Sequence, residues 1–163
     1  SAEARVLLLG EVSRAAGTPA GMVAGQAHDI AAESRDVSGD ELEQIHHLKT
    51  GALIAASARS GAIIAGAGAS ELESVTRYAR ALGLLFQITD DLLDVTASAE
   101  DLGKTPGKDA RSRKATYPAL YGLEATRERA QATYKDACDA LDEIERPMTT
   151  LRAIVRLILE RRT

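Results

Sequence analysis

One segment restricts the fold of this chain more than any other: seven of the twelve residues 84–95 are apolar, and three carboxylates lie among them. Apolar residues occur nearly all round a helical projection of this segment, which is typical of a buried helix rather than a surface helix. Gln87, Asp90, Asp91 and Asp94 fall within roughly a 100° arc of that helix. Because carboxylates on a buried helix have to be paired or metal-bound, the segment predicts a helix with one acidic, ligand-binding face.

The ligand that best suits this acidic face is a hard cation. Carboxylates so close together repel one another unless a cation lies among them, and Mg²⁺ is usually bound by one or two carboxylates together with substrate phosphate. The residues that follow, 99–115, are rich in Gly and Lys, and Lys104 and Lys108 are candidates for binding that phosphate. No strand precedes this loop, so it is not a P-loop. The alternative interpretation is a solvated acidic face without a ligand.

Composition predicts an all-α protein. Hydrophobic residues make up 45% of the 163 residues and aromatic residues 3%, and Ala, Leu, Glu and Arg are frequent. This length suits a single helical domain or fragment, residues 1–163. The net charge of −4 gives no electrostatic basis for nucleic-acid binding. The single cysteine, Cys138, favours a cytoplasmic setting, and neither a transmembrane segment nor a signal peptide is expected.

Helix starts and ends can be assigned along the chain. The pattern predicts helices over residues 2–16, 19–33, 40–66, 71–98, 123–145 and 150–162, with a short helix before Gly122. We expect N-caps at Thr18, Ser38, Ser70 and Thr116.

The third predicted helix contains a polar group directly before a run of small residues. Lys49 and Thr50 follow two histidines, and taken alone these side chains are typical of a surface. The small residues from Gly51 to Ala62 allow another helix to approach closely, so we expect Lys49 near a helix crossing. On the second helix, Gln26 and Asp29 are three apart and face the same way, as either exposed or functional residues.

Four sequence segments together resemble the trans-isoprenyl diphosphate synthases, the polyprenyl synthetase family that includes farnesyl and geranylgeranyl diphosphate synthases. FQITDDLLDV resembles the family's second aspartate-rich motif, and DLGKTPGKDARSRKATYPALYGLE resembles the segment that follows it. HHLKTGALIAAS resembles the family's Lys-Thr helix, and GMVAGQAHDI resembles its Gly-Gln segment. The segments occur in the family's order and approximate spacing over nearly the whole chain.

The resemblance implies an isoprenoid synthase-type helical bundle that condenses isopentenyl diphosphate with an allylic prenyl diphosphate. Asp90, Asp91 and Asp94 would then bind Mg²⁺, while Lys49, Lys104 and Lys108 would bind the substrate diphosphate. Thr50 and Gln87 would direct oxygen dipoles towards the positive charge that develops on the allylic carbon. The resemblance also implies a dimer, because members of this family are usually dimeric.

The chain departs from the family in one respect, because the first aspartate-rich motif and the basic residues nearer the N-terminus are absent. We therefore expect the C-terminal half of a synthase, which needs an N-terminal half or a homo-oligomer partner for activity. Two other interpretations are a non-catalytic partner or regulatory subunit of a complete synthase and, less favoured by the Lys-Thr segment, a terpene cyclase. Product chain length depends on residues that are absent from this sequence.

Overall fold

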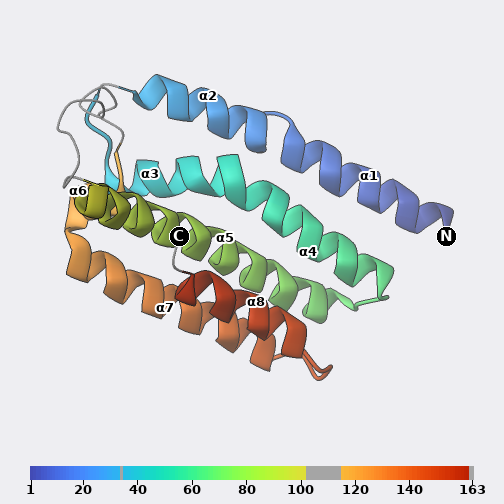
Figure 1. Cartoon of the computed structure of the whole chain (residues 1–163). Helices are drawn as coiled ribbons and strands as arrows, with labels where there is room; N and C mark the ends of the chain where they lie inside the picture. The colour runs from blue at the N-terminus through green and yellow to red at the C-terminus, as the bar shows by residue number, and fades with distance from the viewer. Residues whose placement is uncertain (34, 102–114, 162–163) are drawn as a thin grey trace.

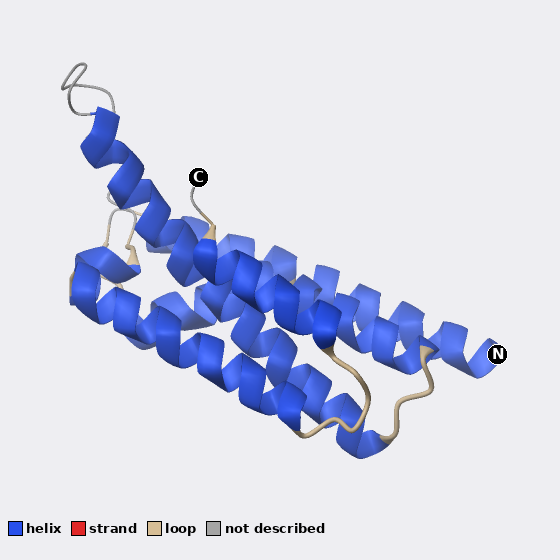
Figure 2. Ribbon diagram, turned by 60° about the horizontal axis from the view of Figure 1, so that its bottom comes forward, coloured by secondary structure: helices blue, strands red, loops and turns tan. Residues whose placement is uncertain are grey.

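The chain folds into a bundle of helices. The computed structural model describes residues 1–33, 35–101 and 115–161, and the side chains of these residues apart from 96–101. Within these ranges Figure 2 shows helices and loops without a strand, which confirms the all-α prediction. The elements in chain order are α1 (Ala2–Ala16), α2 (Met22–Ala32), α3 (Gly39–His46), the π-helical turn η1 (His47–Gly51), α4 (Ala52–Ile64), α5 (Ala69–Asp101), α6 (Tyr117–Tyr121), α7 (Leu123–Asp142) and α8 (Thr149–Glu160).

The helix that carries the acid cluster, α5, lies at the centre of the arrangement (Figure 1). It packs against α7 and α8 on one side and against α4 and η1 on the other. The outer layer consists of α1, which packs against α4, and α2, which packs against η1. This layering explains why the sequence of α5 is apolar nearly all round: a central helix has neighbours on several faces.

The core forms around an apolar stripe of α5. Tyr78, Leu85 and Ile88 are at most 1% exposed, and their spacing of seven and three residues places them on one face of the helix. The core residues from the other helices that are equally inaccessible are Tyr117, Ala137, Leu141 and Val155. Burial raises the pKa of Tyr78 to about 12, and its hydroxyl donates to the Leu151 carbonyl at 3.3 Å.

Two of the predicted helix caps are confirmed. The backbone N–H of Glu41 donates to Ser38 Oγ at 3.2 Å, and that of Ala119 donates to Thr116 Oγ1 at 3.3 Å. These bonds satisfy N–H groups that have no partner within the first helical turn. The predicted break at Gly122 is also present, where a φ of 83° ends α6 and is readily adopted by glycine.

The other two predicted caps are wrong. Thr18 does not begin a helix, because α2 starts at Met22 with Gly21 as its N-cap. A side chain on Gly21 would overlap the Arg14 and Ala15 carbonyls, so the chain has to run past the end of α1 before it can turn into α2. Ser70 lies inside α5, and the Gly68 N–H donates to the Glu71 side chain at 3.2 Å instead.

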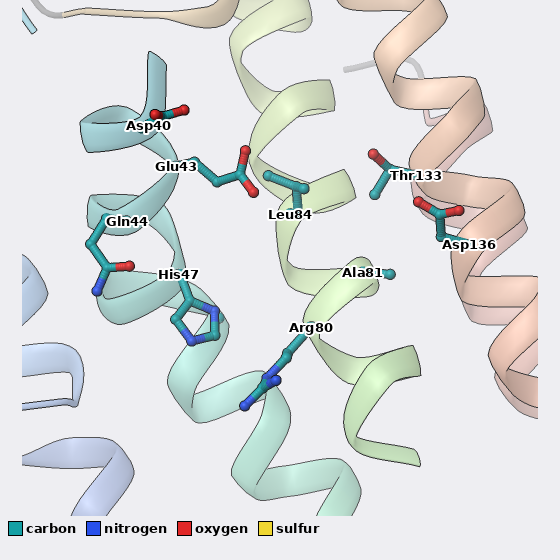
Figure 3. Close-up of a pocket in the computed structure, with 10 residues that line it drawn as sticks. Asp40, Glu43, Gln44, His47, Arg80, Ala81, Leu84, Thr133 and Asp136 are labelled. Atoms are coloured by element: carbon teal, nitrogen blue, oxygen red, sulfur yellow. The ribbon is translucent and has the colours of Figure 1, made fainter. Parts of the chain in front are cut away.

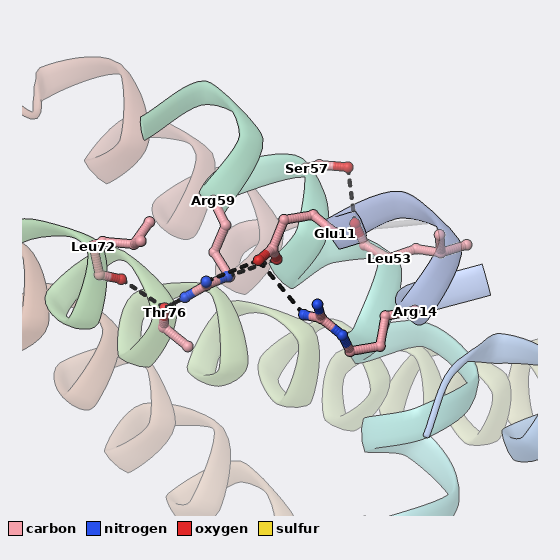
Figure 4. Close-up of polar contacts among 7 residues, drawn as sticks. All are labelled: Glu11, Arg14, Leu53, Ser57, Arg59, Leu72 and Thr76. Carbon is pink, nitrogen blue, oxygen red and sulfur yellow. Dashed lines mark hydrogen bonds and ion pairs between the residues drawn. The ribbon is translucent and has the colours of Figure 1, made fainter. Parts of the chain in front are cut away.

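The outer helix α1 is attached to the bundle by an arginine (Figure 4). The guanidinium of Arg59 on α4 donates to both carboxylate oxygens of Glu11 at 2.7 and 2.9 Å, and to Thr76 Oγ1 on α5 at 2.6 Å. These hydrogen bonds, with the charge of Arg59, hold the pKa of Glu11 below its usual value. The guanidinium of Arg59 therefore joins α1, α4 and α5 through charge-assisted hydrogen bonds.

Four large apolar side chains of α1 are accessible. They are Val6, Leu7, Leu9 and Val12, which are between 52% and 69% exposed. None of the helices in the described ranges combines the length and the apolar character needed to cross a membrane.

Candidate active site

The candidate site is built around η1, the π-helical turn between α3 and α4. The continuous helix predicted over residues 40–66 is therefore wrong in its middle. Two neighbouring helices approach this turn closely: a Cβ on Gly25 of α2 would overlap the Lys49 backbone nitrogen, and a Cβ on Gly83 of α5 would lie 2.9 Å from Gly51 Cα. The expected helix crossing at Lys49 is thus confirmed. Such π-turns occur frequently at functional sites.

Lys49 points from η1 towards α2, where it meets Asp29. Its Nζ donates to Asp29 Oδ2 at 2.6 Å, and the two side chains are 30% and 16% exposed. Asp29 therefore belongs to the site, although the sequence showed only that it shares a helix face with Gln26. A lysine ammonium has three donors, so this ion pair leaves Lys49 able to bind a further acceptor.

Thr50 points from the same turn towards α5, where it meets Gln87. The Thr50 hydroxyl donates to Gln87 Oε1 at 2.6 Å. The structure therefore brings together two residues that are 37 positions apart in sequence and that the family resemblance assigned to one role. Since the hydroxyl hydrogen is directed at Gln87, the lone pairs of the Thr50 oxygen face away from that bond.

The three aspartates of the acid cluster have different surroundings. Asp91 is buried at 6% exposure, and its Oδ2 accepts the backbone N–H of Tyr117 at 2.9 Å. That N–H belongs to the first turn of α6, which has no helical partner to offer it. Asp91 thus connects the acid cluster to the start of α6.

Asp90 and Asp94 lie one turn apart on α5 and are more accessible. The Asp90 side chain is 49% exposed, and its Oδ1 accepts from Arg161 Nη2 at 3.2 Å. Asp94 is exposed. Across the described ranges, no three or more His, Cys, Asp and Glu side chains are grouped as a metal site would need. Lys104 and Lys108 lie outside the described residues, so their predicted role stays a prediction.

A polar cleft of about 380 Å³ lies between α3, α5 and α7 (Figure 3). None of the six predicted site residues that the structure describes lines it; its polar lining residues are Asp40, Glu43, Gln44, His47, Arg80, Thr133 and Asp136. His47 is half-buried there, and burial together with nearby Arg80 lowers the pKa of its imidazole. Adjacent histidines gave no sequence signal for this cleft, because it depends on the packing of three separate helices.

The comparison with protein families identifies the family of this chain. Residues 11–151 match the family model described as polyprenyl synthetase. The chain belongs to the polyprenyl synthetase family. The Lys49, Thr50 and Gln87 cluster and the aspartates of α5 all lie within the matched residues.

Relatives and solved structures agree with this family. The heterodimeric geranylgeranyl pyrophosphate synthase large subunit 1 of Arabidopsis thaliana, a chloroplastic protein, is 48% identical over 139 residues, which are 83% of this chain and 37% of that protein. The crystal structure of a farnesyl-diphosphate synthase from Marinomonas sp. MED121, described as putative, superposes with a TM-score of 0.82 at 33% identity and covers 98% of this chain and 54% of that one.

A third comparison concerns a ligand-bound structure. A geranyltransferase from Helicobacter pylori, solved in complex with magnesium and isoprenyl diphosphate, superposes with a TM-score of 0.76 at 29% identity, over 98% of this chain and 52% of that one. The chain thus spans 37% of the length of the curated relative and about half of each solved structure. The predicted bundle of the prenyl synthase type is confirmed.

The carboxylates of α5 fit Mg²⁺ held jointly with a phosphate. Mg²⁺ keeps several waters and takes one or two carboxylates together with substrate oxygens, rather than an all-protein cage. Asp90 and Asp94 offer such carboxylates from adjacent turns of α5, at an accessible position.

Arg161 is the site residue that sequence reasoning missed. It follows the end of α8, a helix that the sequence indicates only as scaffold, and it reaches α5 over 71 positions to contact Asp90. A local pattern contains no signal for such a pair, because the contact depends on how α8 folds back onto α5. Only the presence of a basic residue at a helix end was visible, and that is common on surfaces.

Proposed function

We propose that this chain forms part of a Mg²⁺-dependent prenyl diphosphate synthase, which condenses isopentenyl diphosphate with an allylic prenyl diphosphate to give a longer polyprenyl diphosphate. The observation that carries the proposal is the Thr50–Gln87 hydrogen bond of 2.6 Å, which joins η1 to the helix of the acid cluster. It places the Lys-Thr turn beside the aspartate helix, as a site that ionises a diphosphate ester requires.

The diphosphate would be held by lysines and by a metal. Lys49 retains donors beyond its bond to Asp29, and Lys104 and Lys108 are proposed to supply further positive charge. Asp90 and Asp94, with Asp91 beside them, would hold Mg²⁺, which supplies charge stabilisation for the leaving pyrophosphate. Asp91 differs from the other two, since one of its oxygens accepts the Tyr117 N–H and orients the carboxylate.

Thr50 and Gln87 would act on the allylic group. As the bond to the diphosphate breaks, positive charge develops on the allylic carbon, and preorganised oxygen dipoles stabilise it without reorganisation of water. The Thr50–Gln87 bond fixes both side chains, and the lone pairs of Thr50 Oγ1 are the dipole that remains available. No side chain is needed as the final base if the released pyrophosphate takes the proton.

We further propose that activity needs additional polypeptide, either an N-terminal half or a partner subunit. Two observations support this: the chain spans 37% of a curated relative, and α1 exposes four large apolar side chains. The same observations support the second candidate function, a non-catalytic partner or regulatory subunit. The relative from Arabidopsis thaliana is named as a subunit of a heterodimeric synthase, which favours keeping this candidate. A cytoplasmic location stays a prediction.

Ligand-dependent thermal stability tests the metal–diphosphate site. With Mg²⁺ and pyrophosphate at about one hundred times Kd, binding contributes about 2.7 kcal/mol, which corresponds to a rise in Tm of about 5 to 10 °C for a chain of this size. Asp90→Ala should abolish the rise. Asp139→Ala is the matched control, because Asp139 is exposed on α7 and pairs with Lys135 at 2.6 Å. An equal rise in the Asp90→Ala protein would contradict the proposed site.

Chain elongation with radiolabelled isopentenyl diphosphate separates the two candidate functions. We expect no product from the 163-residue chain alone and product when an N-terminal half of a polyprenyl synthetase is added in trans. Product from the isolated chain would refute the need for further polypeptide. A complemented complex that binds Mg²⁺ and pyrophosphate and yet forms no product would favour the regulatory subunit.

A further inference from the structure

The C-terminal end of α8 is fastened to the acid-cluster helix by one side chain, Arg161. Its Nη2 donates to the Phe86 carbonyl at 2.7 Å and to Asp90 Oδ1 at 3.2 Å, and its Nε donates to Thr89 Oγ1 at 3.1 Å. The guanidinium also lies over the Phe86 ring, 4.3 Å from its centroid. The side chain is 22% exposed, so these contacts are partly shielded from water.

A second arginine of α8 shows what an ordinary surface pair looks like in this chain. Arg156 donates to Glu160 at 2.8 Å, one turn away on the same helix, and the two side chains are 69% and 58% exposed. Both partners of that pair belong to α8. Arg161, in contrast, joins the end of α8 to three residues within one turn of α5: Phe86, Thr89 and Asp90.

The contacts of Arg161 with α5 have a direct consequence for a cation at Asp90. We propose that Arg161 is the positive partner of Asp90 when no metal is bound, and that a divalent cation competes with Arg161 for this carboxylate. This inference rests on the proposed function. Two cations held within a few ångströms of one carboxylate repel each other, and the repulsion is strong where water is partly excluded. Arg161 is thus a positioning residue that acts on the metal site through Asp90.

Because of this competition, metal binding at Asp90 and the attachment of Arg161 to α5 depend on each other. If Arg161 weakens metal binding by some factor, metal binding weakens the hold of Arg161 on α5 by the same factor, because the coupling between two sites is reciprocal. Occupancy of the acid cluster therefore controls how firmly the end of α8 is attached. The donors to the Phe86 carbonyl and Thr89 remain available to keep Arg161 nearby.

The test uses the whole chain and Mn²⁺ alone as the probe, with binding followed by electron paramagnetic resonance. Arg161→Gln removes the charge and should tighten Mn²⁺ binding by at least about fivefold, the lower end of typical couplings between sites. Arg161→Lys keeps a positive charge, so its affinity should lie nearer to that of the wild type. Arg156→Gln is the matched control on the same helix and should leave the affinity unchanged.

Thermal unfolding supplies a second readout, which does not depend on enzyme activity. In EDTA, Arg161→Gln should lower Tm by about 2 to 4 °C for each kcal/mol of lost contacts, and the loss should become smaller in saturating Mg²⁺. A loss that is the same in EDTA and in Mg²⁺ would show that the metal does not compete with Arg161. The Arg156→Gln protein should show no such metal dependence.

The outcomes distinguish this inference from the proposed function. If wild type and Arg161→Gln bind Mn²⁺ equally, and Asp90→Asn abolishes binding in both, the competition is refuted while the metal site stands. If Asp90→Asn leaves Mn²⁺ binding intact, or if no variant binds Mn²⁺ even when pyrophosphate is added, the metal site of the proposed function fails and the inference fails with it.

Discussion

Replacing Gly83 by alanine tests whether the close approach of α5 to η1 positions the site. The new Cβ would lie 2.9 Å from Gly51 Cα. Carbon atoms pack at about 3.5 to 4.0 Å, so α5 and η1 would have to separate by about 0.6 to 1.1 Å. Added to the Thr50–Gln87 distance of 2.6 Å, that separation exceeds the range of an O–H···O hydrogen bond, which ends near 3.0 Å.

The stability change in Gly83→Ala should be modest by comparison. Overpacking of a core typically costs about 1 to 3 kcal/mol, while alanine gains about 1 kcal/mol over glycine inside a helix. We therefore expect a net loss of about 0 to 2 kcal/mol in urea unfolding, so the protein stays folded while the site is disturbed. The rise in Tm with Mg²⁺ and pyrophosphate should fall, because Lys49 and Thr50 lie on the displaced turn.

Gly61→Ala is the matched control for this experiment. Gly61 also lies inside a helix, α4, but a Cβ added there would meet nothing within 4 Å. The control should gain up to about 1 kcal/mol of unfolding free energy and keep its response to ligand. If Gly83→Ala is stabilised as much as Gly61→Ala and binds ligand normally, the close approach does not position the site.

Two further predictions concern single carboxylates. Glu11→Gln should cost about 1 to 2 kcal/mol at pH 7, because it removes the charged partner of Arg59. Since the pKa of Glu11 is lowered in the folded protein from 4.5, this contribution is present above that value and is lost as pH falls below it. Urea unfolding should show the wild type and Glu11→Gln converging at acidic pH; a constant gap down to pH ~3 would exclude the ion pair as its cause. Asp91→Ala should lower the free energy of unfolding by about 1 to 3 kcal/mol, because the buried Tyr117 N–H loses its acceptor. Asp91→Asn keeps an acceptor oxygen and should lower it less. Equal losses in the two variants would contradict this role of Asp91.

Local sequence patterns predicted the helices well where a short-range signal exists. The caps at Ser38 and Thr116 and the break at Gly122 depend on neighbouring residues, and all three are present. Thr18 carried the same type of signal and was misassigned, because contact with the end of α1 delays the start of α2 until Met22. Propensity is overridden where another element occupies the space.

The π-turn was beyond prediction for a different reason. Its side chains continue a helical pattern, and the change from α to π hydrogen bonding involves backbone groups that every residue shares. Thr50 and Gln87 could be assigned to one site by family resemblance, while their hydrogen bond required the tertiary structure. The contact of Arg161 with Asp90 had neither a local pattern nor a motif to indicate it.

The π-turn also changes how sequence position translates into direction. A π-turn accommodates about one residue more than an α-turn, and one residue corresponds to about 100° of rotation. The faces of α3 and α4 are therefore offset by about that angle relative to an uninterrupted helix. Removing a single residue between 47 and 51 would restore the α-helical register and rotate one helix against the other. In this part of the chain, the number of residues between α3 and α4 sets the relative orientation of the two helices as much as the identity of those residues does.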